Sequence, residues 1–218
     1  MTLSNATVRP LRRDAAKNRE RLLEAAGQVF DEQGLEASVA DVARAAGVGM
    51  GTLYRRFPTK EALIDALVTE VLATTIAMAK EAAGQPDGSG LERFLEASSR
   101  YLAAHVGCLP RLWRSDHELV HTARRLVADL LADAKVHRRV RADLTSTDIS
   151  LALWSMRGVL ETTGGTAPEA ARRHLDLLIA GMRPSTDKLP HRPVSQAHVD
   201  RILGSAGSPR AIPPPCSG

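Results

Sequence analysis

The sequence predicts an all-α protein that combines an N-terminal three-helix domain with a C-terminal helical bundle. Hydrophobic residues make up 44% of the 218 positions but aromatic residues only 3%, so the core must consist mainly of Leu, Ala and Val. Apolar residues recur at spacings of three and four, the period of a helix with one buried face. Helix-capping residues precede several of these segments, and Gly or Pro follows them. These features favour helices over a sheet.

The first helix is expected from Asp14 to Gln33, and Gly34 would end it. Its buried face would carry Leu22, Ala25, Ala26, Val29 and Phe30. A capping box opens the next helix, because Ser38 can accept from a free backbone amide while Asp41 reaches back. Gly47 then stands where a left-handed residue is needed to end that helix.

Met50 to Phe57 can form a third helix, with Leu53 and Phe57 pointing inward and Pro58 ending it. Two short helices joined by a glycine-containing turn are typical of a helix-turn-helix. The outward face offers small residues, hydroxyls and guanidinium groups, which suit phosphates and major-groove base edges. These outward residues are Gly51, Thr52, Tyr54, Arg55 and Arg56.

The stretch Ser38 to Leu63 resembles the DNA-binding domain of the TetR family of bacterial transcriptional repressors. It matches the family pattern at Ser38, Val42, Ala43, Ala46, Gly47, Val48, Gly49, Gly51, Thr52, Leu53, Tyr54, Phe57, Thr59, Lys60, Glu61 and Leu63. Arg55 and Arg56 depart from it, since many relatives carry an aromatic residue and then a histidine there. The resemblance covers about the first third of the chain.

The resemblance implies a cytoplasmic transcription regulator that binds double-stranded DNA, most simply a repressor that binds a palindromic operator as a homodimer. The residues that it places on DNA are Ser38, Met50, Gly51, Thr52, Tyr54, Arg55, Arg56 and Lys60, with Ser38, Tyr54 and Lys60 on phosphates. Arg55 or Arg56 would reach guanine, the base that arginine contacts most often. It implies no enzymatic activity and no cofactor.

We divide the chain into four parts. Residues 1–13 would be a flexible basic arm that is solvated and disordered and also touches the DNA backbone, and the net charge of +4 agrees with a modest basic excess. Residues 14–60 would be the DNA-binding domain, and residues 61–183 a regulatory and dimerisation domain. Residues 184–218 are rich in Pro, Ser and Gly and are expected to be a disordered tail, with a possible short helix at 197–203.

The regulatory domain is expected to be a series of helices. Glu61 to Ala83 would be one long helix with two apolar sides, and helices would follow at 91–106 and 117–136, with a short one at 110–113. Thr145 and Asp148 form a second capping box, and Thr166 and Glu169 a third. In TetR-like proteins the last two helices pair with those of a partner. Here they are Thr145 to Leu160 and Pro168 to Met182, with apolar candidates Leu153, Val159, Leu175, Leu178 and Ile179.

The family resemblance also implies a small-molecule effector that binds in the bundle and releases the DNA. Its walls would come from Phe94, Tyr101, Trp113, His117, His121, Trp154 and Met156, with Arg157 as a charged anchor. This composition favours a mostly apolar compound, aromatic or anionic. The alternative is a bundle filled by its own side chains, which would make the protein a helix-turn-helix regulator without a ligand.

Three other classes of protein remain as alternatives. A metal-binding protein would need His105, Cys108, His117 and His121 together, but a proline-containing loop separates these residues. A helical enzyme would need a nucleophile with its base, and the neighbours Ser115, Asp116 and His117 do not face one another on a helix. A helical scaffold that merely carries a helix-turn-helix is a third alternative. Like the enzyme, it leaves the basic outward face of the third helix unexplained. The sequence also predicts no membrane contact, because no apolar run is long enough to span a bilayer.

Overall fold

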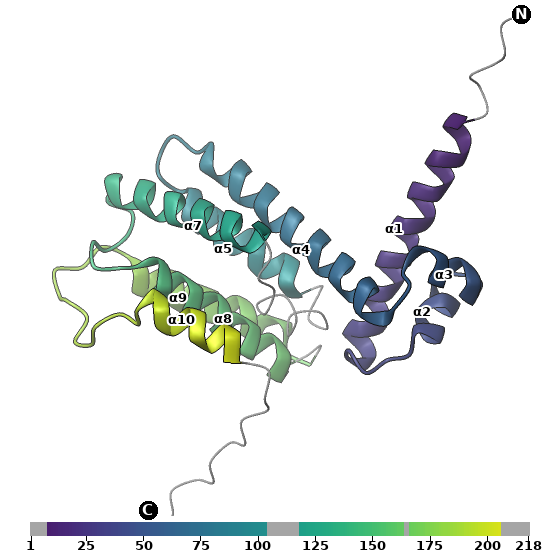
Figure 1. Cartoon of the computed structure of the whole chain (residues 1–218). Coiled ribbons are helices and arrows are strands. Elements are labelled where there is room, and N and C mark those ends of the chain that lie inside the picture. Colours follow the sequence, from purple (N-terminus) through teal and green to yellow (C-terminus); the bar gives the residue numbers. More distant parts are fainter. Residues whose placement is uncertain (1–7, 104–117, 164–165, 206–218) are drawn as a thin grey trace, which may run out of the picture.

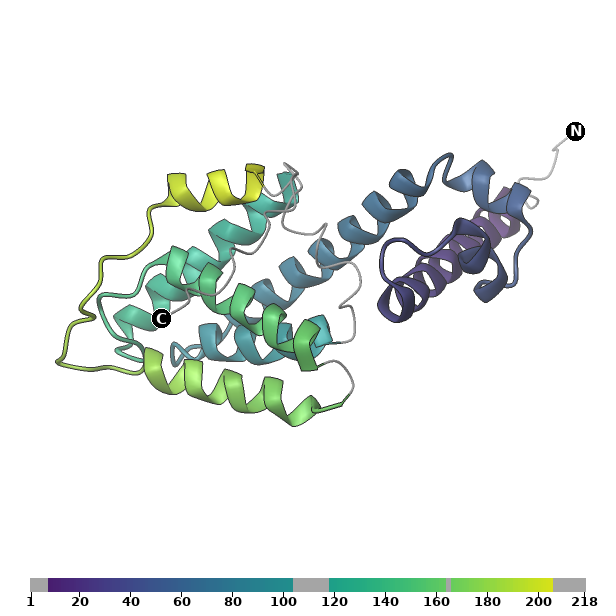
Figure 2. The same cartoon turned by 90° about the horizontal axis from the view of Figure 1, so that it is seen from below.

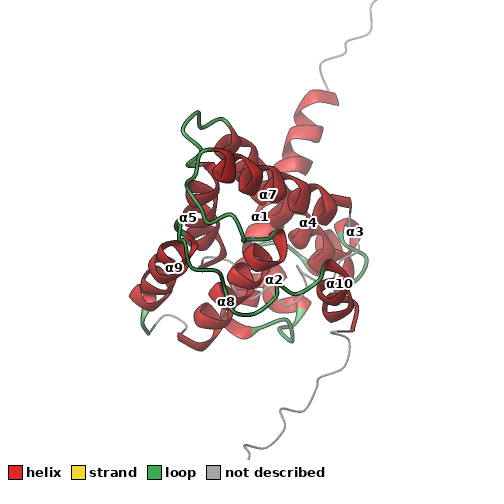
Figure 3. Cartoon of the chain, turned by 90° about the vertical axis from the view of Figure 1, so that its left-hand side faces the viewer, coloured by secondary structure: helices red, strands yellow, loops and turns green. Residues whose placement is uncertain are grey.

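The computed structural model describes residues 8–103, 118–163 and 166–205, and in these ranges the chain forms helices and no strand (Figure 3). The helices are α1 (Val8–Gln33), α2 (Val39–Ala45), α3 (Met50–Arg56), α4 (Lys60–Ala83), α5 (Gly90–Ala103), α7 (Glu118–Val136), α8 (Ser146–Thr163), α9 (Pro168–Met182) and α10 (Gln196–Ser205). The predicted all-α fold is confirmed. The predicted short helix at 110–113 lies outside the described residues.

The helices form two groups joined by one long helix. Figure 1 shows α1, α2 and α3, the N-terminal domain, at one end of the molecule and α5 and α7–α10, the C-terminal bundle, at the other. α4 runs from the first group into the second, packing against α1 at its beginning and against α5 and α7 farther along. The helix therefore contacts both groups, as the sequence predicted, with different partners along its length.

Local hydrogen bonds explain the short helices of the N-terminal domain. Ser38 caps α2, and its hydroxyl donates to Asp41 Oδ2 over 2.6 Å while Asp41 N donates back over 3.2 Å. Gly34 ends α1 at φ 74° and Gly47 follows α2 at φ 65°, which is left-handed backbone that a side chain would strain. Phe30, Leu53 and other apolar residues of α1–α3 form a buried core.

Capping also defines where the later helices begin. The predicted capping box at Thr145 is present, because Thr145 N donates to Asp148 Oδ2 over 2.8 Å and Asp148 N donates to Thr145 Oγ1 over 3.3 Å. The third predicted box is wrong: Ala167 is the N-cap of α9, without a side-chain cap. Pro168 at the first helical position needs no amide partner, so the helix begins there without a capping hydroxyl. Thr59, which the sequence analysis passed over, caps α4 by accepting from Ala62 N.

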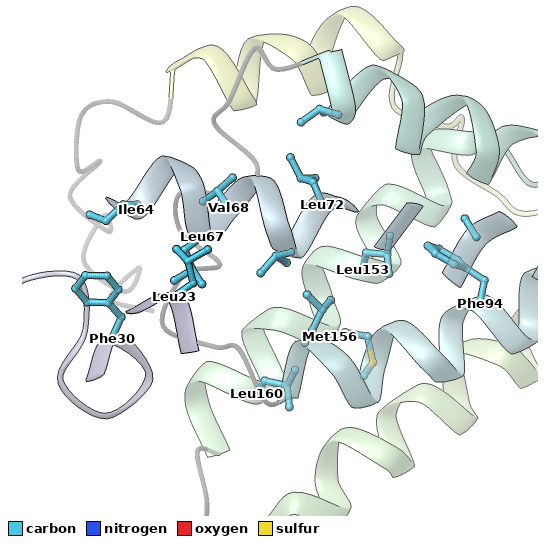
Figure 4. Packing of buried hydrophobic residues seen from close by; sticks show 14 of the residues in the cluster. Leu23, Phe30, Ile64, Leu67, Val68, Leu72, Phe94, Leu153, Met156 and Leu160 are labelled. Atoms are coloured by element: carbon cyan, nitrogen blue, oxygen red, sulfur yellow. The ribbon is translucent and has the colours of Figure 1, made fainter. Parts of the chain in front are cut away.

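α4 is long and apolar enough to cross a membrane by length and composition alone. The prediction that the chain holds no such run is therefore wrong. The core helix of a protein outside membranes passes the same test when it is apolar on two sides. Leu63, Leu67 and Val71 are among the buried residues of α4, so packing explains its composition. Figure 4 shows Ile64, Leu67, Val68 and Leu72 of this helix among other buried apolar side chains.

Both ends of the described chain differ from the predicted boundaries. α1 begins at Val8, so much of the segment predicted as a flexible arm is helical. Pro10 falls in its first turn, where proline costs no hydrogen bond, and arginine is a good helix former. At the other end, residues 184–205 are not a disordered tail. Residues 183–195, the C-terminal strap, turn back after α9 and lead into α10, close to the short helix predicted at 197–203 (Figure 1).

Side-chain contacts along the strap hold α10 in place. Arg141 Nε lies 2.6 Å from Asp143 Oδ1 and its Nη2 donates to Asp187 O, while Leu189 N donates to Asp143 Oδ2 over 3.1 Å. Farther along, Thr147 Oγ1 donates to Val194 O over 2.8 Å. The local composition of the tail could not reveal these contacts, since every partner lies more than forty residues away along the chain.

Candidate functional site

The third helix presents the candidate DNA-binding surface. Leu53 is buried beneath it and Phe57 follows it inward, so the opposite side faces solvent. Gly51, Tyr54 and Arg55 are exposed on that side, and Thr52 is half-buried. The exposed fraction of Tyr54 is 46%, a large value for an aromatic residue. The sequence analysis therefore identified the outward face correctly.

Arg55 and Arg56 take different positions around α3. Successive residues of an α-helix are about 100° apart, so Arg55 stands almost opposite Leu53 while Arg56 stands at the edge of the buried face. Arg56 lines a shallow surface hollow with Arg19 of α1 and Glu70 of α4. Of the two, Arg55 is the better placed to point away from the protein.

The predicted phosphate-binding residues differ in their exposure to solvent and in whether they already make hydrogen bonds within the protein. The Ser38 hydroxyl both donates to and accepts from Asp41, so its main role is to cap α2. These hydrogen bonds, with the neighbouring Arg44 at 2.8 Å, hold the pKa of the Asp41 carboxyl below its usual value. Lys60 is half-buried at the start of α4, and Met50 is exposed at the start of α3.

A second candidate site is a cavity inside the C-terminal bundle. It has a volume of about 80 Å³ and lies between α4, α5, α7, α8 and α10. Its lining residues are Leu72, Thr75, Phe94, Ser98, Leu102, Val120, Ala123, Arg124, Val127, Ser146, Ser150, Leu153, Trp154, Gln196 and Val199. Figure 4 shows that Leu72, Phe94 and Leu153 come from three different helices that meet here.

Only part of the predicted ligand wall lines this cavity. Phe94 and Trp154 do, whereas Met156 is buried in the core and Tyr101 packs against the core elsewhere. Trp113 and His117 lie outside the described residues. His121 is exposed on α7, and the residues considered with it as metal ligands, His105, Cys108 and His117, lie outside the described residues.

The predicted anchor Arg157 is also absent from the cavity wall. Its Nε lies 2.7 Å from Glu161 Oε1 on the same helix, one turn on. The arginine that does line the cavity is Arg124, and Asp200 of α10 lies 3.1 Å from it. The sequence analysis missed it because its partner stood in a segment that was expected to be disordered.

Two further groups of cavity residues escaped the sequence analysis. Gln196 and Val199 belong to α10, and no local pattern indicates where a short C-terminal helix docks. Ser98 left a usable signal, because it is a polar residue on the apolar stripe of α5. Such a residue is either hydrogen-bonded inside the core or turned towards a cavity.

The helices predicted to form a dimer interface are α8 and α9, which pack against each other. Leu153 and Leu175 are buried inside the subunit, whereas Val159, Leu178 and Ile179 are half-buried. Leu177, which the sequence analysis did not single out, is 57% exposed on α9. Gly158 of α8 and Gly181 of α9 are exposed too, so this face has room for a close helix–helix contact.

Comparison with known proteins agrees with this architecture. Residues 22–67 match the family described as bacterial regulatory proteins, tetR family. An HTH-type transcriptional regulator of Staphylococcus aureus is 42% identical over 72 residues, which are 33% of this chain. The match spans only 39% of that relative's length.

Solved structures extend the similarity beyond the N-terminal domain. A TetR transcriptional regulator of Streptomyces coelicolor is similar at 34% sequence identity and a TM-score of 0.56, covering 77% of this chain and 99% of that one. A TetR-like regulator of Mycobacterium smegmatis, solved in complex with proflavine, has the same fold at 22% identity and a TM-score of 0.56. It covers 77% of this chain and 97% of its own.

Proposed function

Because the chain belongs to the TetR family of DNA-binding transcriptional regulators, we propose that it is a cytoplasmic repressor that binds a palindromic operator as a homodimer and is released by a small molecule. One observation carries the effector part of this proposal. α4 reaches from the N-terminal domain to the cavity, with Leu67 facing Gly27 of α1 and with Leu72 and Thr75 in the cavity wall. A change at the cavity can therefore move the DNA-binding end of the same helix.

On the DNA side, α3 would lie in the major groove. Arg55 would contact a base edge, while Gly51 allows the helix backbone to approach the DNA closely. Tyr54 and Lys60 would hold phosphates on either side. Arg56 would act as a further phosphate contact from the edge of the helix, and Ser38 would act through the α2 cap.

Two recognition helices are needed because a helix as short as α3 contacts few base pairs. A two-fold dimer presents two such helices to half-sites about one helical turn apart, 34–36 Å. The face formed by Gly158, Leu177 and Gly181 supports a dimer through α8 and α9. The half-buried Val159 and Leu178 would complete the interface.

The effector would act by favouring one spacing of the recognition helices over another. It can release DNA only if it binds the protein more tightly in the arrangement that does not fit the operator. A shift of a few ångströms at the N-terminal domain is enough, since DNA sets the spacing of the two half-sites. The M. smegmatis regulator binds proflavine within the same fold, which supports a search for an effector here.

The DNA-binding part is tested by selecting bound sequences from genomic DNA and measuring affinity over a range of salt concentrations. We expect Tyr54→Ala with Lys60→Ala to weaken binding to all sequences, and Lys60→Ala alone to lower the salt slope by about one. Lys80→Ala, at the other end of α4, is the matched control and should bind normally. Unchanged affinity in the double variant would refute this assignment.

The small volume of the cavity favours a second candidate function, a regulator without an effector. Ligand sites usually enclose about 300–1,000 Å³, and the cavity holds about 80 Å³ with α10 in place. A thermal-shift screen followed by DNA-release assays separates the two functions. If no compound both stabilises the protein and releases DNA, the regulator acts through its own concentration alone.

A further inference from the structure

A buried hydroxyl lines the cavity without a hydrogen-bond partner among the residues that the structure describes. Ser98 is only 2% exposed, and its Oγ has neither a donor nor an acceptor within reach in those residues. A hydroxyl inside a helix often donates to the carbonyl four residues earlier. Two hydroxyls of the cavity wall do so, since Thr75 Oγ1 lies 2.8 Å from Val71 O and Ser150 Oγ lies 3.1 Å from Ser146 O. The Ser98 hydroxyl is not used in this way.

The charge of the cavity wall is already balanced. Among the described wall residues Arg124 is the one charged group, and its Nη1 lies 3.1 Å from Asp200 Oδ1. Gln196 also donates to this carboxylate oxygen, over 3.0 Å. A charged ligand enclosed in the cavity would find no free countercharge, and burying an unpaired charge is costly.

Most of the other wall residues are apolar, although Thr75, Ser146 and Ser150 also belong to the wall. Phe94, Leu102 and Leu153 are buried, and Val199 of α10 is only 1% exposed. Such a wall favours a hydrocarbon or aromatic body, because removing apolar surface from water is the main source of affinity in this kind of site. The unpartnered Ser98 hydroxyl adds one position at which a polar atom of the ligand would gain a hydrogen bond.

We propose that the cavity takes an uncharged, mostly apolar compound with one hydrogen-bonding oxygen, and that the Ser98 hydroxyl holds this oxygen. The inference rests on the proposed function only in taking this cavity as the effector site. It replaces Arg157 by Ser98 as the anchor. It also disfavours the anionic class of effector that the sequence had left open, because Arg124 is already paired with Asp200.

Three probes of equal chain length test the proposal: 1-hexanol, hexanoate and hexane, with dissociation constants measured by ligand-observed NMR on the full chain. We expect wild-type protein to bind 1-hexanol roughly tenfold more tightly than the other two, the effect of one well-made hydrogen bond. In Ser98→Ala the affinity for 1-hexanol should fall below that for hexane, because its hydroxyl would be buried without a partner, while hexane binds as before. Ser99→Ala changes a second buried serine of α5 that does not line the cavity, so it should keep the preference for the alcohol.

The thermal stability of ligand-free Ser98→Ala separates a binding role from a structural one. Removing an unpartnered buried hydroxyl should leave the melting temperature unchanged or raise it. A lower melting temperature would mean that the hydroxyl has a structural partner, which would overturn the proposal.

Other results would overturn it as well. Tighter binding of hexanoate that is lost in Arg124→Gln would assign the cavity to an anion that displaces Asp200. A preference for 1-hexanol that persists in Ser98→Ala, or no binding of any probe, would equally reject Ser98 as the anchor. If 1-hexanol binds through Ser98 but leaves DNA affinity unchanged, this site stands and effector control of DNA binding fails.

Discussion

Arg55 and Arg56 are neighbours in sequence, but the fold gives them different surroundings. Arg55 lies opposite the buried Leu53, and Arg56 lies beside α1 and α4. We expect Arg55→Ala to cost about 1–3 kcal/mol of binding and to relax the preference for one base pair. Arg56→Ala should lower the affinity for the operator and for a duplex of random sequence by the same factor. Fluorescence anisotropy with operator duplexes that carry single base changes would measure both. Loss of sequence preference in Arg56→Ala but not in Arg55→Ala would reverse the assignment.

Asp143 makes the stability of the strap depend on pH. The Arg141 guanidinium and the Leu189 amide hold the pKa of the Asp143 carboxyl well below its usual value. A carboxyl with a lowered pKa in the folded state stabilises the protein above its unfolded pKa, about 3.9, and this stabilisation is lost as the pH falls further. We therefore expect Asp143→Asn to lower the melting temperature at pH 7. The difference from wild type should shrink below about pH 4.

Asp129→Asn is the control for this pH dependence, because Asp129 is exposed on α7. Its melting temperature should follow that of the wild-type protein at every pH. If the difference in melting temperature between Asp143→Asn and wild type stays constant with pH, the effect comes from altered side-chain packing and not from loss of the carboxylate charge.

Among the elements, α9 offers the most exposed large apolar residue of the proposed dimer interface. We expect Leu177→Arg to give a folded monomer in sedimentation at concentrations where wild type is a dimer, because two buried arginines would face each other across the two-fold axis. Ile202→Arg, at a similarly exposed position on α10, should remain a dimer. Leu175→Arg is unsuitable for this test, since Leu175 is buried inside the subunit and the change would unfold the bundle. A dimeric Leu177→Arg would place the interface elsewhere.

α10 is expected to cover the cavity through a single apolar side chain. Val199 is almost completely buried, so Val199→Ala should cost roughly 1–2 kcal/mol, the loss of two buried methyl groups. The variant should also bind more of a hydrophobic dye. Figure 2 shows α10 apart from α9, with α8 between them, so the proposed dimer face is unaffected. Val136→Ala, at a residue that is 78% exposed, should have no effect in chemical denaturation. Equal stability of the two variants would mean that α10 does not pack on the bundle in solution.

For the molecule as a whole, α4 is the expected mechanical link between cavity and DNA. Thr69→Gly with Glu70→Gly places two helix-weakening residues where the contact with α1 ends, at the ion pair of Glu70 with Arg19, and before Leu72 and Thr75 of the cavity wall. We expect the protein to keep its affinity for operator and for any compound that releases it. Operator DNA and the compound each lower the protein's affinity for the other, and by linkage they do so by the same factor. In this variant the factor should fall towards one. Lys80→Gly with Glu81→Gly, beyond the cavity, should keep the coupling. Unchanged coupling in the first variant would exclude transmission through the middle of α4.

Features that depend on neighbouring residues could be predicted from the sequence. Helix periodicity, the caps at Ser38 and Thr145, and the left-handed Gly34 and Gly47 are local, because their hydrogen bonds and steric limits involve residues a few positions apart. These features were enough to predict the all-α fold and the helix-turn-helix. They also identified the outward face of α3, since the inward positions follow from helical spacing alone.

Features that depend on contacts between distant segments became visible in the three-dimensional structure. It placed α10 over the bundle, paired Asp200 with Arg124, and separated Arg157 from the cavity that Ser98 lines. It also buried Leu175 and left its near neighbour Leu177 exposed on the same helix. The physical reason is that apolar spacing marks a helix face as buried without saying what buries it, another helix of the subunit or a partner. That choice is made by packing between segments far apart in the sequence, and no local pattern records it.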